Sequence, residues 1–506
     1  ATNIFAIQSE IAEAIAETLR MTLSPREQQR IRSVPTESLA AYEAYLIGKQ
    51  RLAKRTTQSL AEAEEYFRQA VELDPRYALA WVGLADTYVL QTDYSGLPKR
   101  ESFDKAKAAI DMALELDRGL GEAYATLGLL MMNMNDPEGA EQAFKKALEL
   151  SPNYAPGHKW FSILLMTELG RWEERRVRME TAVRLDPMST SIRYGYAISL
   201  REIGRAEEAL EQLEIALEID PKFSRAYESI ATIQWQVFNR LDMAAQGTVK
   251  AITLEPGRSD MHVWLGQLYL DLGEPERASL LLDRANELTP DNNLTAWGGL
   301  LLHLYQQTTG GLVENATTVL ANPFGSPWHT QICAAQLRNQ AMAEGRLDEA
   351  LSVYSKYHPQ LLLDEEPVID LTNYRAAIDL SLVLQLMGDQ ERASMLLERS
   401  AAFIRGQPRL GWWGGYWISD VQILALEGKK AEALAALQVA ADEGWRSLWW
   451  YYLQYDPNLE FIRSEPEFQA ILAEIKTDIS AQMQRIRRME QSGEIGTVPG
   501  VIFESL

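Results

Sequence analysis

The chain has 506 residues, with 71 Asp and Glu against 49 Lys and Arg, so its formal charge is −22 at pH 7. This acidity disfavours binding to nucleic acid or to anionic lipid as the main activity. A hydrophobic content of 46% indicates a folded chain, and the sequence has no apolar run of about eighteen residues that would predict a transmembrane helix.

Residues 3–23 predict an amphipathic helix that Ser24-Pro25 ends. Its apolar residues fall on one stripe, which consists of Ile4, Ile7, Ile11, Ile15, Leu19 and Leu23. The motifs Ile4-Phe5-Ala6-Ile7-Gln8 and Glu10-Ile11-Ala12 resemble the helix that links a TolB-like domain to a tetratricopeptide array in bacterial multidomain regulators and class III nucleotide cyclases. The alternative is a helix that covers the open edge of the first repeat. Because the chain begins Ala-Thr-Asn, without Met or a signal-peptide core, we expect a segment of a longer protein.

From Tyr42 the spacing of small and apolar residues predicts helical hairpins. The first ends at the Glu72–Pro75 stop and carries about three extra residues, which we expect in its turn. The second contains an insertion at residues 91–101. This insertion is either a binding loop or a tolerated surface loop.

Residues 121–154 form the clearest unit. Tyr124, Leu127, Gly128 and Met131 fall at helical spacing in one half, and Ala140, Phe144 and Ala147 do so in the other, before Pro152. This pattern resembles the 34-residue tetratricopeptide repeat. The small residues Gly128 and Ala140 let the two helices approach closely. Since one hairpin cannot bury its apolar face alone, neighbouring hairpins are expected.

Further stops follow at Pro187, Pro221, Pro256 and Pro290, at intervals of 34 or 35 residues from Pro152. Beyond Pro290 the pattern decays, with long connections near 322–328, 359–373 and 406–415. We predict an all-α fold, a right-handed α-solenoid of about eleven tetratricopeptide-like hairpins with a C-terminal helical cap. The predicted divisions are a helix and linker at 1–40, a regular array at 41–292, divergent hairpins at 293–447, and a cap and tail at 448–506.

The end of the chain is rich in large aromatics, and a polar helix to about Gln491 follows. Asp456-Pro457, Leu459-Glu460, Arg463 and Pro466-Glu467-Phe468 resemble the terminal segment of TolB-linked tetratricopeptide proteins. The rings either form the interior of the cap or line a pocket for a small molecule or glycan between Trp412, Trp413, Trp417, Trp449 and Trp450.

No signature of an enzyme stands out. The sequence has no Gly-rich phosphate loop and no metalloprotease, serine hydrolase or EF-hand motif, and its five histidines are scattered. We expect His158 and His262 to pack inside repeats and Cys333 to be an inert buried thiol. We therefore predict a non-enzymatic protein without a cofactor or a metal site.

In tetratricopeptide arrays the first helices of successive hairpins line a concave face that holds a partner, as the resemblance implies. The set here lacks the Lys and Asn pattern of repeats that clamp a carboxylate. Aromatic and Arg side chains are common at binding hot spots. The predicted partner-binding residues are Lys159, Trp160, Tyr194, Arg201, Arg225, Glu228, Trp235 and Trp264.

Three functions remain open. The first is a scaffold that binds a protein or peptide in the groove, with no nucleic acid expected for this segment. The second is a regulatory or sensory part of a larger nucleotide cyclase or DNA-binding transcription regulator. The third is an oligomer or a permanent subunit of a complex. The compartment is undecided between periplasm and cytoplasm.

Overall fold

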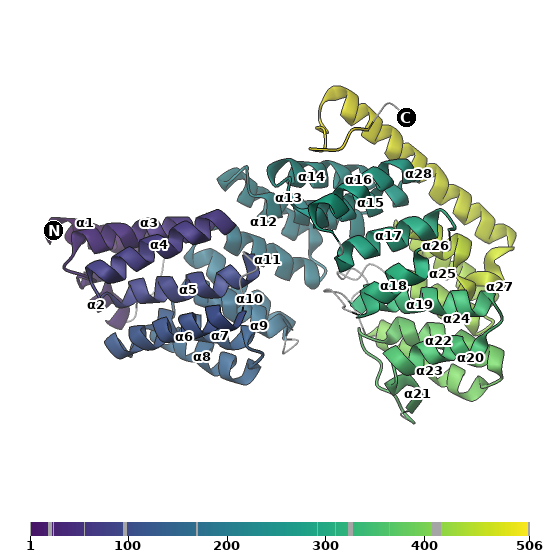
Figure 1. Cartoon of the computed structure of the whole chain (residues 1–506), viewed down its shortest axis with the longest axis horizontal. Coiled ribbons are helices and arrows are strands. Elements are labelled where there is room, and N and C mark those ends of the chain that lie inside the picture. The colour runs from purple at the N-terminus through teal and green to yellow at the C-terminus, as the bar shows by residue number, and fades with distance from the viewer. Residues whose placement is uncertain are drawn as a thin grey trace. The chain divides into compact units, whose positions relative to one another are not determined.

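The computed structural model describes residues 2–18, 23, 25–54, 56–94, 99–167, 171–290, 292–308, 310–321, 327–363, 365–406 and 416–503. These residues form 28 α-helices and one 3-10 helix, and no strand occurs among them, so the predicted all-α class is confirmed (Figure 1). The chain divides into an amino-terminal unit, Ala1–Ser199, and a carboxy-terminal unit, Leu200–Leu506. The predicted divisions at residues 40, 292 and 447 stay a prediction.

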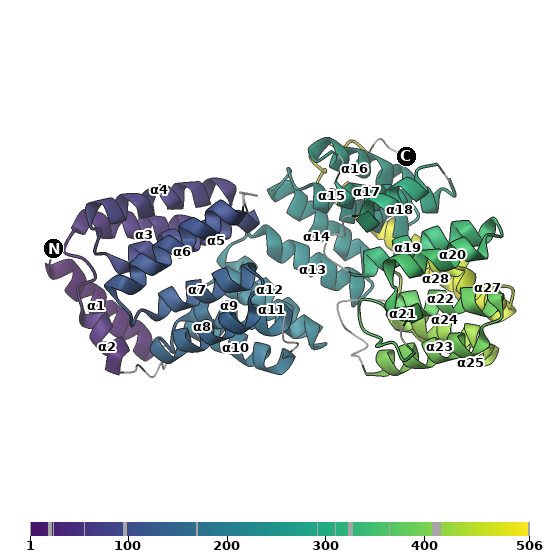
Figure 2. The same ribbon diagram turned by 60° about the horizontal axis from the view of Figure 1, so that its bottom comes forward.

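The amino-terminal unit begins with two single helices and continues with helix pairs. Figure 2 shows α7, α8, α9 and α10 packed side by side, with α9 in contact with both α7 and α8. The single helices are α1 (Thr2–Thr18) and α2 (Pro25–Arg32), and the following helices are α3 (Leu39–Lys54), α4 (Thr57–Leu73), α5 (Ala78–Tyr94), α6 (Lys99–Leu116), α7 (Gly121–Asn133), α8 (Pro137–Leu150), α9 (Ala155–Thr167), α10 (Trp172–Leu185) and α11 (Thr190–Glu202).

The carboxy-terminal unit continues the pairs. Within the two units, consecutive helices pack against each other as ten hairpins in the described residues, whereas the sequence predicts about eleven. The helices are α12 (Ala206–Ile219), α13 (Ser224–Gln236), α14 (Leu241–Leu254), α15 (Ser259–Asp271), α16 (Pro275–Leu288), α17 (Asn293–Tyr305), α18 (Leu312–Ala321), α19 (Pro327–Ala343), α20 (Leu347–Tyr357), α21 (Gln360–Leu363), α22 (Tyr374–Met387), α23 (Gln390–Arg405), α24 (Tyr416–Leu426), α25 (Lys430–Asp442), α26 (Trp449–Tyr455), the 3-10 helix η1 (Pro457–Leu459), α27 (Glu460–Arg463) and α28 (Pro466–Ser492).

The close approach of the two helices in a hairpin depends on glycine facing an aromatic ring. A Cβ atom at Gly128 in α7 would lie 2.8 Å from ring carbons of Phe144 in α8. The Phe144 ring is fully buried and stacks on Phe161 of the next hairpin at 5.6 Å between ring centroids. Asp136 accepts a hydrogen bond from the Gly139 backbone and so begins α8, with Pro137 in its first turn. These contacts explain the repeat spacing in the sequence.

The first hairpin differs from the prediction in one respect. Its helices have 16 and 17 residues, against 13 and 14 in the pair α7 and α8. The extra residues therefore lengthen the helices, and their expected place in the turn is wrong. The cause is the capping box of Thr56 and Ser59, which begins α4 directly after the end of α3. Most of the predicted insertion at 91–101 is helical as well, and residues 95–98 lie outside the described residues.

Helix α2 and the connection that follows it contact residues at the ends of later helices. Thr36 donates a 2.5 Å hydrogen bond to Asp74, and Glu27 accepts hydrogen bonds from the Asn153 backbone and side chain, each at 3.1 Å. The described part of the predicted apolar stripe, at Ile7, Ile11 and Ile15, remains exposed. At these three positions the helix therefore does not cover the open edge of the first repeat, which is the alternative interpretation of the stripe.

The final helix α28 ends at Ser492, close to Gln491, where the sequence predicts that a polar helix ends. This helix contacts more than the last hairpin. Figure 1 shows it running diagonally along the carboxy-terminal unit, from α27 toward α16. Gln482 accepts a 2.7 Å hydrogen bond from the Leu241 backbone at the start of α14, where Arg240 supplies no side-chain cap. Glu490 accepts a 2.6 Å hydrogen bond from Arg277 of α16. The cap thus ties the end of the chain to the middle of the array.

Candidate functional site

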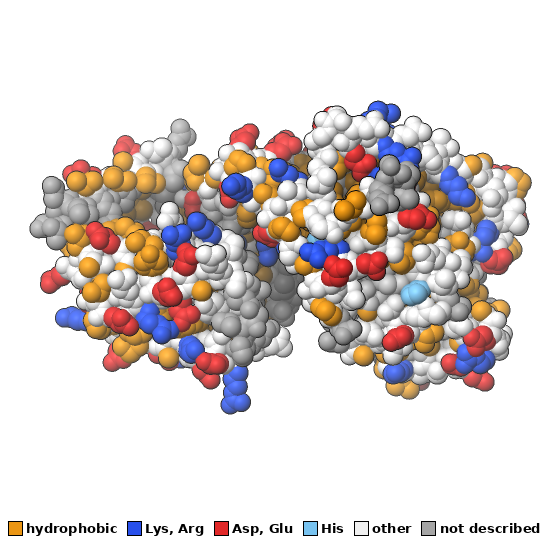
Figure 3. Space-filling model, turned by 45° about the horizontal axis from the view of Figure 1, so that its top comes forward, with side chains coloured by type: hydrophobic (Ala, Val, Ile, Leu, Met, Phe, Trp, Pro, Cys, Tyr) orange, Lys and Arg blue, Asp and Glu red, His pale blue; other side chains and the backbone are white. Residues whose placement is uncertain are grey.

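The two units differ in charge. The amino-terminal unit has 24 Lys and Arg against 28 Asp and Glu, whereas the carboxy-terminal unit has 25 against 43. The acidity of the chain therefore belongs mainly to the carboxy-terminal unit. On the face shown in Figure 3, acidic and basic side chains are interspersed with hydrophobic ones. Such a mixed surface favours no single charged ligand.

Three of the predicted partner-binding residues lie on first helices of the amino-terminal unit. Lys159 and Tyr194 are half-buried, so part of each side chain remains accessible. Trp160 is only 4% exposed and packs edge-on against Tyr154, with ring centroids 6.4 Å apart. Its ring is part of the core, and its role in partner binding stays a prediction.

A charged group outside the predicted partner-binding set lies on α3, the first helix of the first hairpin. Lys49 is exposed, and Tyr45, Asp86, Glu122 and Asp186 raise the pKa of its amine, so the residue is a stable cation. The carboxylate of Asp86 is fixed by a 2.6 Å hydrogen bond from Thr126. This part of the unit therefore presents a cation among ordered acids.

In the carboxy-terminal unit the predicted residues have different environments. Arg201 is buried, Arg225 is exposed, and Glu228 is half-buried and forms an ion pair with Arg258 at 2.8 Å. Trp264 is half-buried beside a group of rings from α17 and α19: its centroid lies 5.8 Å from that of His329. Their binding roles stay a prediction, and Arg225 and Trp264 retain accessible surface.

Trp235 belongs to a buried cluster around Asp271, the last residue of α15. Asp271 is fully buried, and its carboxylate accepts hydrogen bonds from Trp235 Nε1 at 3.2 Å, Trp450 Nε1 at 3.0 Å and the Leu448 backbone at 3.0 Å. Its backbone carbonyl accepts one from Trp449 Nε1 at 2.8 Å. Trp235 is 7% exposed, so its ring is part of the core, and its role in partner binding stays a prediction.

The tryptophans on Asp271 belong to the aromatic segment, Trp445–Tyr455, which crosses the first helices of the carboxy-terminal unit. Each of α15, α17, α19, α22 and α24 supplies a contact to this segment or to the residues directly after it. Beyond Asp271, the contacts are Tyr305 to Trp450 at 4.9 Å between ring centroids, Asn339 to Tyr451 at 3.2 Å, Arg375 to Tyr452 at 2.7 Å and Gln422 to Asp456 at 2.5 Å. A segment of the same chain therefore packs against these first helices.

A buried charge network extends the contact. Arg338, fully buried, donates hydrogen bonds to Asp379 Oδ1 at 3.0 Å and to Asn458 at 3.2 Å, and Asn458 donates one to Asp379 at 2.6 Å. Burial, together with the charge of Asp379, raises the pKa of Asp456 to about 6. Burial also raises the pKa of Asp271 to about 8, although three N–H groups favour its ionised form.

Two of the five tryptophans in the predicted ligand pocket can be placed. Trp449 and Trp450 are buried against Asp271. Trp412 and Trp413 lie outside the described residues, as does the side chain of Trp417. For the two placed rings, packing within the cap accounts for their environment.

His158, His262 and Cys333 are buried and held by the fold. The two histidines make hydrogen bonds to the backbone carbonyls of Pro152 and Arg258, at 2.8 and 2.9 Å respectively. Burial raises the pKa of the Cys333 thiol, which disfavours a reactive thiolate. Within the described ranges, no three His, Cys, Asp or Glu side chains gather in a way that could hold a metal ion. Nor is any helix of this part of the chain long and apolar enough to cross a membrane.

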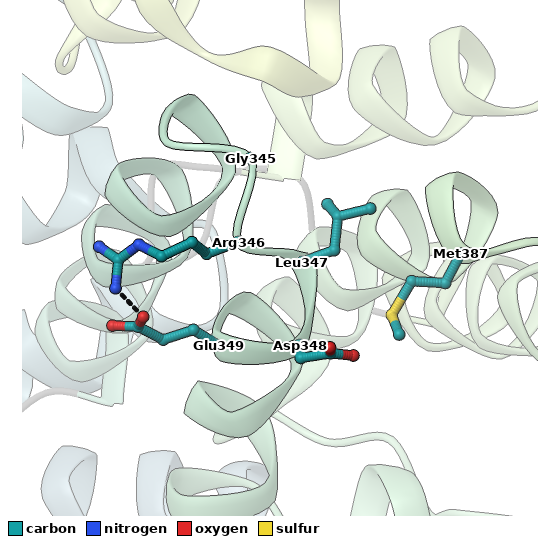
Figure 4. A pocket seen from close by; sticks show the side chains of 6 residues that line it. All are labelled: Gly345, Arg346, Leu347, Asp348, Glu349 and Met387. Atoms are coloured by element: carbon teal, nitrogen blue, oxygen red, sulfur yellow. Dashed lines mark hydrogen bonds and ion pairs between the residues drawn. The ribbon is translucent and has the colours of Figure 1, made fainter.

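A surface hollow lies where the turn before α20 meets the end of α22 (Figure 4). It is lined by Gly345, Arg346, Leu347, Asp348, Glu349 and Met387. Two of the lining residues, Arg346 and Glu349, form an ion pair at one side of it. Since this pair is exposed and the hollow is open, it offers no enclosed binding chemistry.

The chain matches known proteins in several segments. Tetratricopeptide repeat models match residues 121–154, residues 52–96 and 168–222, and residues 259–292. The first of these segments is the hairpin of α7 and α8, and the last is that of α15 and α16.

Curated relatives are similar over part of their length. The transcriptional regulator HilA of Salmonella paratyphi A is 29% identical over 150 residues, 30% of this chain and 27% of HilA. The human protein O-mannosyl-transferase TMTC3 is 26% identical over 191 residues, 36% of this chain and 19% of TMTC3. The putative adenylate cyclase 3 of Rhizobium meliloti is 26% identical over 144 residues, 28% of this chain and 24% of the cyclase. The chain therefore spans about a quarter or less of these relatives.

Solved structures with similar helical pairs cover less than half of the chain. PilF of Pseudomonas aeruginosa has 21% identity and a TM-score of 0.36, and covers 43% of this chain and 97% of its own. TTC0263 of Thermus thermophilus, a tetratricopeptide protein, has 22% identity and a TM-score of 0.30, and covers 37% and 95%. From the repeat matches and the paired helices together, the chain contains tetratricopeptide repeats within residues 52–96, 121–154, 168–222 and 259–292.

Proposed function

We propose that the chain is a non-catalytic scaffold that binds a segment of a protein or peptide partner on the first helices of its amino-terminal unit. The observation that carries this proposal comes from the carboxy-terminal unit. There the first helices α15, α17, α19 and α22 contact the aromatic segment of the chain itself, which leaves less of their surface for a partner. Partner binding is therefore assigned to the amino-terminal unit.

The accessible groups of the amino-terminal unit support this assignment. Lys49 is exposed, and Lys159 and Tyr194 are half-buried. These three side chains come from α3, α9 and α11, which are all first helices. A partner with acidic and aromatic groups would complement them. Charge pairs of this kind set register and association rate more than they set affinity.

Charge reversal tests the assignment. The wild-type chain is used to capture its partner from a lysate of the native host, and the captured partner is then measured against the double variant Lys49→Glu and Lys159→Glu. We expect the capture to fall at least about ten-fold, because the two like charges now face the partner. The control is Lys145→Glu on α8, a second helix, whose side chain is exposed. Equal capture by the double variant and the control would count against binding at the first helices.

A second proposal rests on two relatives. HilA is a transcriptional regulator and the Rhizobium meliloti relative is a putative adenylate cyclase, and both match over part of their length. We propose that this chain is a regulatory or sensory segment of such a larger protein. The gene of the native host tests it: a cyclase core or a DNA-binding domain encoded next to this segment is expected. An initiator Met directly before Ala1 would contradict a preceding domain.

Self-association and permanent membership of a complex stay predictions. Size-exclusion chromatography coupled to light scattering tests the first. A mass equal to that of one chain at all concentrations would exclude a stable homo-oligomer.

A further inference from the structure

Helix α1 carries an exposed apolar stripe. Ile7, Ile11 and Ile15 are 49%, 54% and 52% exposed, and their spacing of four residues places them on one face. Single exposed hydrophobic residues are ordinary on a protein surface, whereas an apolar stripe over two helical turns is typical of an interaction face. The other face of the helix contributes Ala16 to the core.

The charges of α1 all have one sign. Its sequence contains Glu10, Glu13 and Glu17, which are exposed, and contains no Lys or Arg. At 100° per residue, Glu10 and Glu17 lie on the same side of the isoleucine stripe. An occupant of the stripe therefore meets a row of acids along one edge.

We propose that α1 binds a basic amphipathic helix of a partner protein, whose apolar stripe packs on Ile7, Ile11 and Ile15 and whose Lys or Arg side chains face Glu10 and Glu17. The stripe on α1 is not part of any hairpin, so it would be a second binding surface in addition to the one in the proposed function. Glu–Lys and Glu–Arg pairs across such a contact select the partner and its register.

Two other occupants fit the charges less well. A second copy of the chain would bring three further glutamates to the contact, and like charges on facing helices repel. A membrane surface binds amphipathic helices that carry Lys and Arg, because its lipids are anionic. The glutamates beside the stripe of α1 would be repelled by such anionic lipids.

Designed peptides test the proposal on the full chain. Two labelled helical peptides of 17 residues, the length of α1, share a Leu stripe and differ in the residues beside it, which are Lys in one and Glu in the other. We expect fluorescence anisotropy to show at least about ten-fold tighter binding of the Lys peptide. The substitution Ile11→Gln should weaken it several-fold, since it removes apolar contact area. The control Leu363→Gln, at a side chain that is 80% exposed on α21, should change nothing.

Charge reversal sharpens the test. The double variant Glu10→Lys and Glu17→Lys should prefer the Glu peptide. Because these positions are exposed, the variants should remain folded, which circular dichroism checks. A scrambled Lys peptide without helical periodicity should bind at least about ten-fold more weakly than the ordered one.

Three results would overturn the proposal. Equal binding of the scrambled and ordered Lys peptides would mean attraction to the net charge of the chain alone. Equal binding to wild type and Ile11→Gln would place the peptide elsewhere. Self-association of the chain that Ile11→Gln abolishes would identify a second copy as the occupant.

Discussion

Asp271 and Trp450 are 179 residues apart in sequence, and Trp450 Nε1 donates a 3.0 Å hydrogen bond to Asp271 Oδ1. The same carboxylate accepts hydrogen bonds from Trp235 and from the backbone of Leu448. One buried side chain of α15 therefore joins an earlier hairpin to the aromatic segment at the end of the repeats. The segment closes the carboxy-terminal unit over its own first helices.

The variant Asp271→Ala should destabilise the carboxy-terminal unit strongly. It leaves two indole N–H groups and one backbone N–H group buried without this acceptor, and each such group costs about 1–3 kcal/mol. We expect the free energy of unfolding to fall by about 3 kcal/mol or more. Tryptophan fluorescence during urea unfolding measures it, because ten of the 13 tryptophans belong to this unit.

The matched control is Asp283→Ala on α16, where the side chain is exposed. This variant should change the free energy of unfolding by less than about 0.5 kcal/mol. If Asp271→Ala unfolds at the same urea concentration as the control, the carboxylate does not hold the aromatic segment in place.

The contribution of Asp271 to stability should depend on pH. Burial raises its pKa to about 8 in the folded chain, against an ordinary value of 3.8. Between these values the folded state keeps a proton that the unfolded state has released. Its contribution is therefore complete at acid pH, decreases as the pH rises through this range by up to about 1.4 kcal/mol per pH unit, and levels off above pH 8.

Comparison with Asp271→Asn isolates this effect, because the amide does not titrate. The free energy of unfolding of the wild type minus that of the variant should decrease from pH 5 to pH 8. A difference that stays constant or rises over this range would mean that the carboxyl is ionised in the folded chain.

The hairpins could be predicted because their packing rules are local. Gly128, Ala140 and Phe144 stand at fixed spacing since a ring from one helix fills the space that a glycine leaves on the other. Each Pro after a second helix marks the next unit. The extra residues of the first hairpin lie in its helices and not in its turn, because the cap at Thr56 permits a longer helix without lengthening the turn.

The closure by the aromatic segment could not be predicted in the same way. Four complete hairpins separate the hairpin of Asp271 from Trp449 and Trp450 in the sequence. An acidic residue on a first helix is also expected to face a partner and not to be buried. Trp235 is predicted to bind a partner because an exposed tryptophan is costly, whereas in the structure its ring is buried and its indole N–H donates to Asp271. The available signals were the crowd of rings after Trp445 and the apolar neighbours of Asp271 in Leu268–Leu272.

Removal of Arg338 should cost far more than removal of a surface arginine. Arg338 is fully buried and pairs with Asp379, so Arg338→Met leaves that carboxylate buried near Asp456 without its cation. Breaking a buried pair on one side costs about 3–5 kcal/mol. Urea unfolding of Arg338→Met should show a loss of this size.

Arg346→Met supplies the comparison, since Arg346 pairs with Glu349 on the surface. Its cost should be below about 1 kcal/mol. The double variant Arg338→Met and Asp379→Leu should recover part of the loss, because no unpaired charge of that pair remains. Equal costs for the two arginine variants would show that the buried network contributes no more than a surface pair.

The last prediction concerns the contact that sets the repeat spacing. Alanine in place of glycine inside a helix normally stabilises it by about 0.5–1 kcal/mol. In Gly128→Ala, however, the new methyl group would lie 2.8 Å from the Phe144 ring, which is fully buried and stacked on Phe161, so the ring has little room to move. Overpacking of this kind costs about 1–3 kcal/mol and outweighs the gain, so the free energy of unfolding should fall. At Gly257, where a Cβ would meet nothing within 4 Å, Gly257→Ala should leave the thermal midpoint nearly unchanged. Far-UV circular dichroism during heating compares the two, and a Gly128→Ala variant as stable as Gly257→Ala would mean that α7 and α8 do not depend on this close approach.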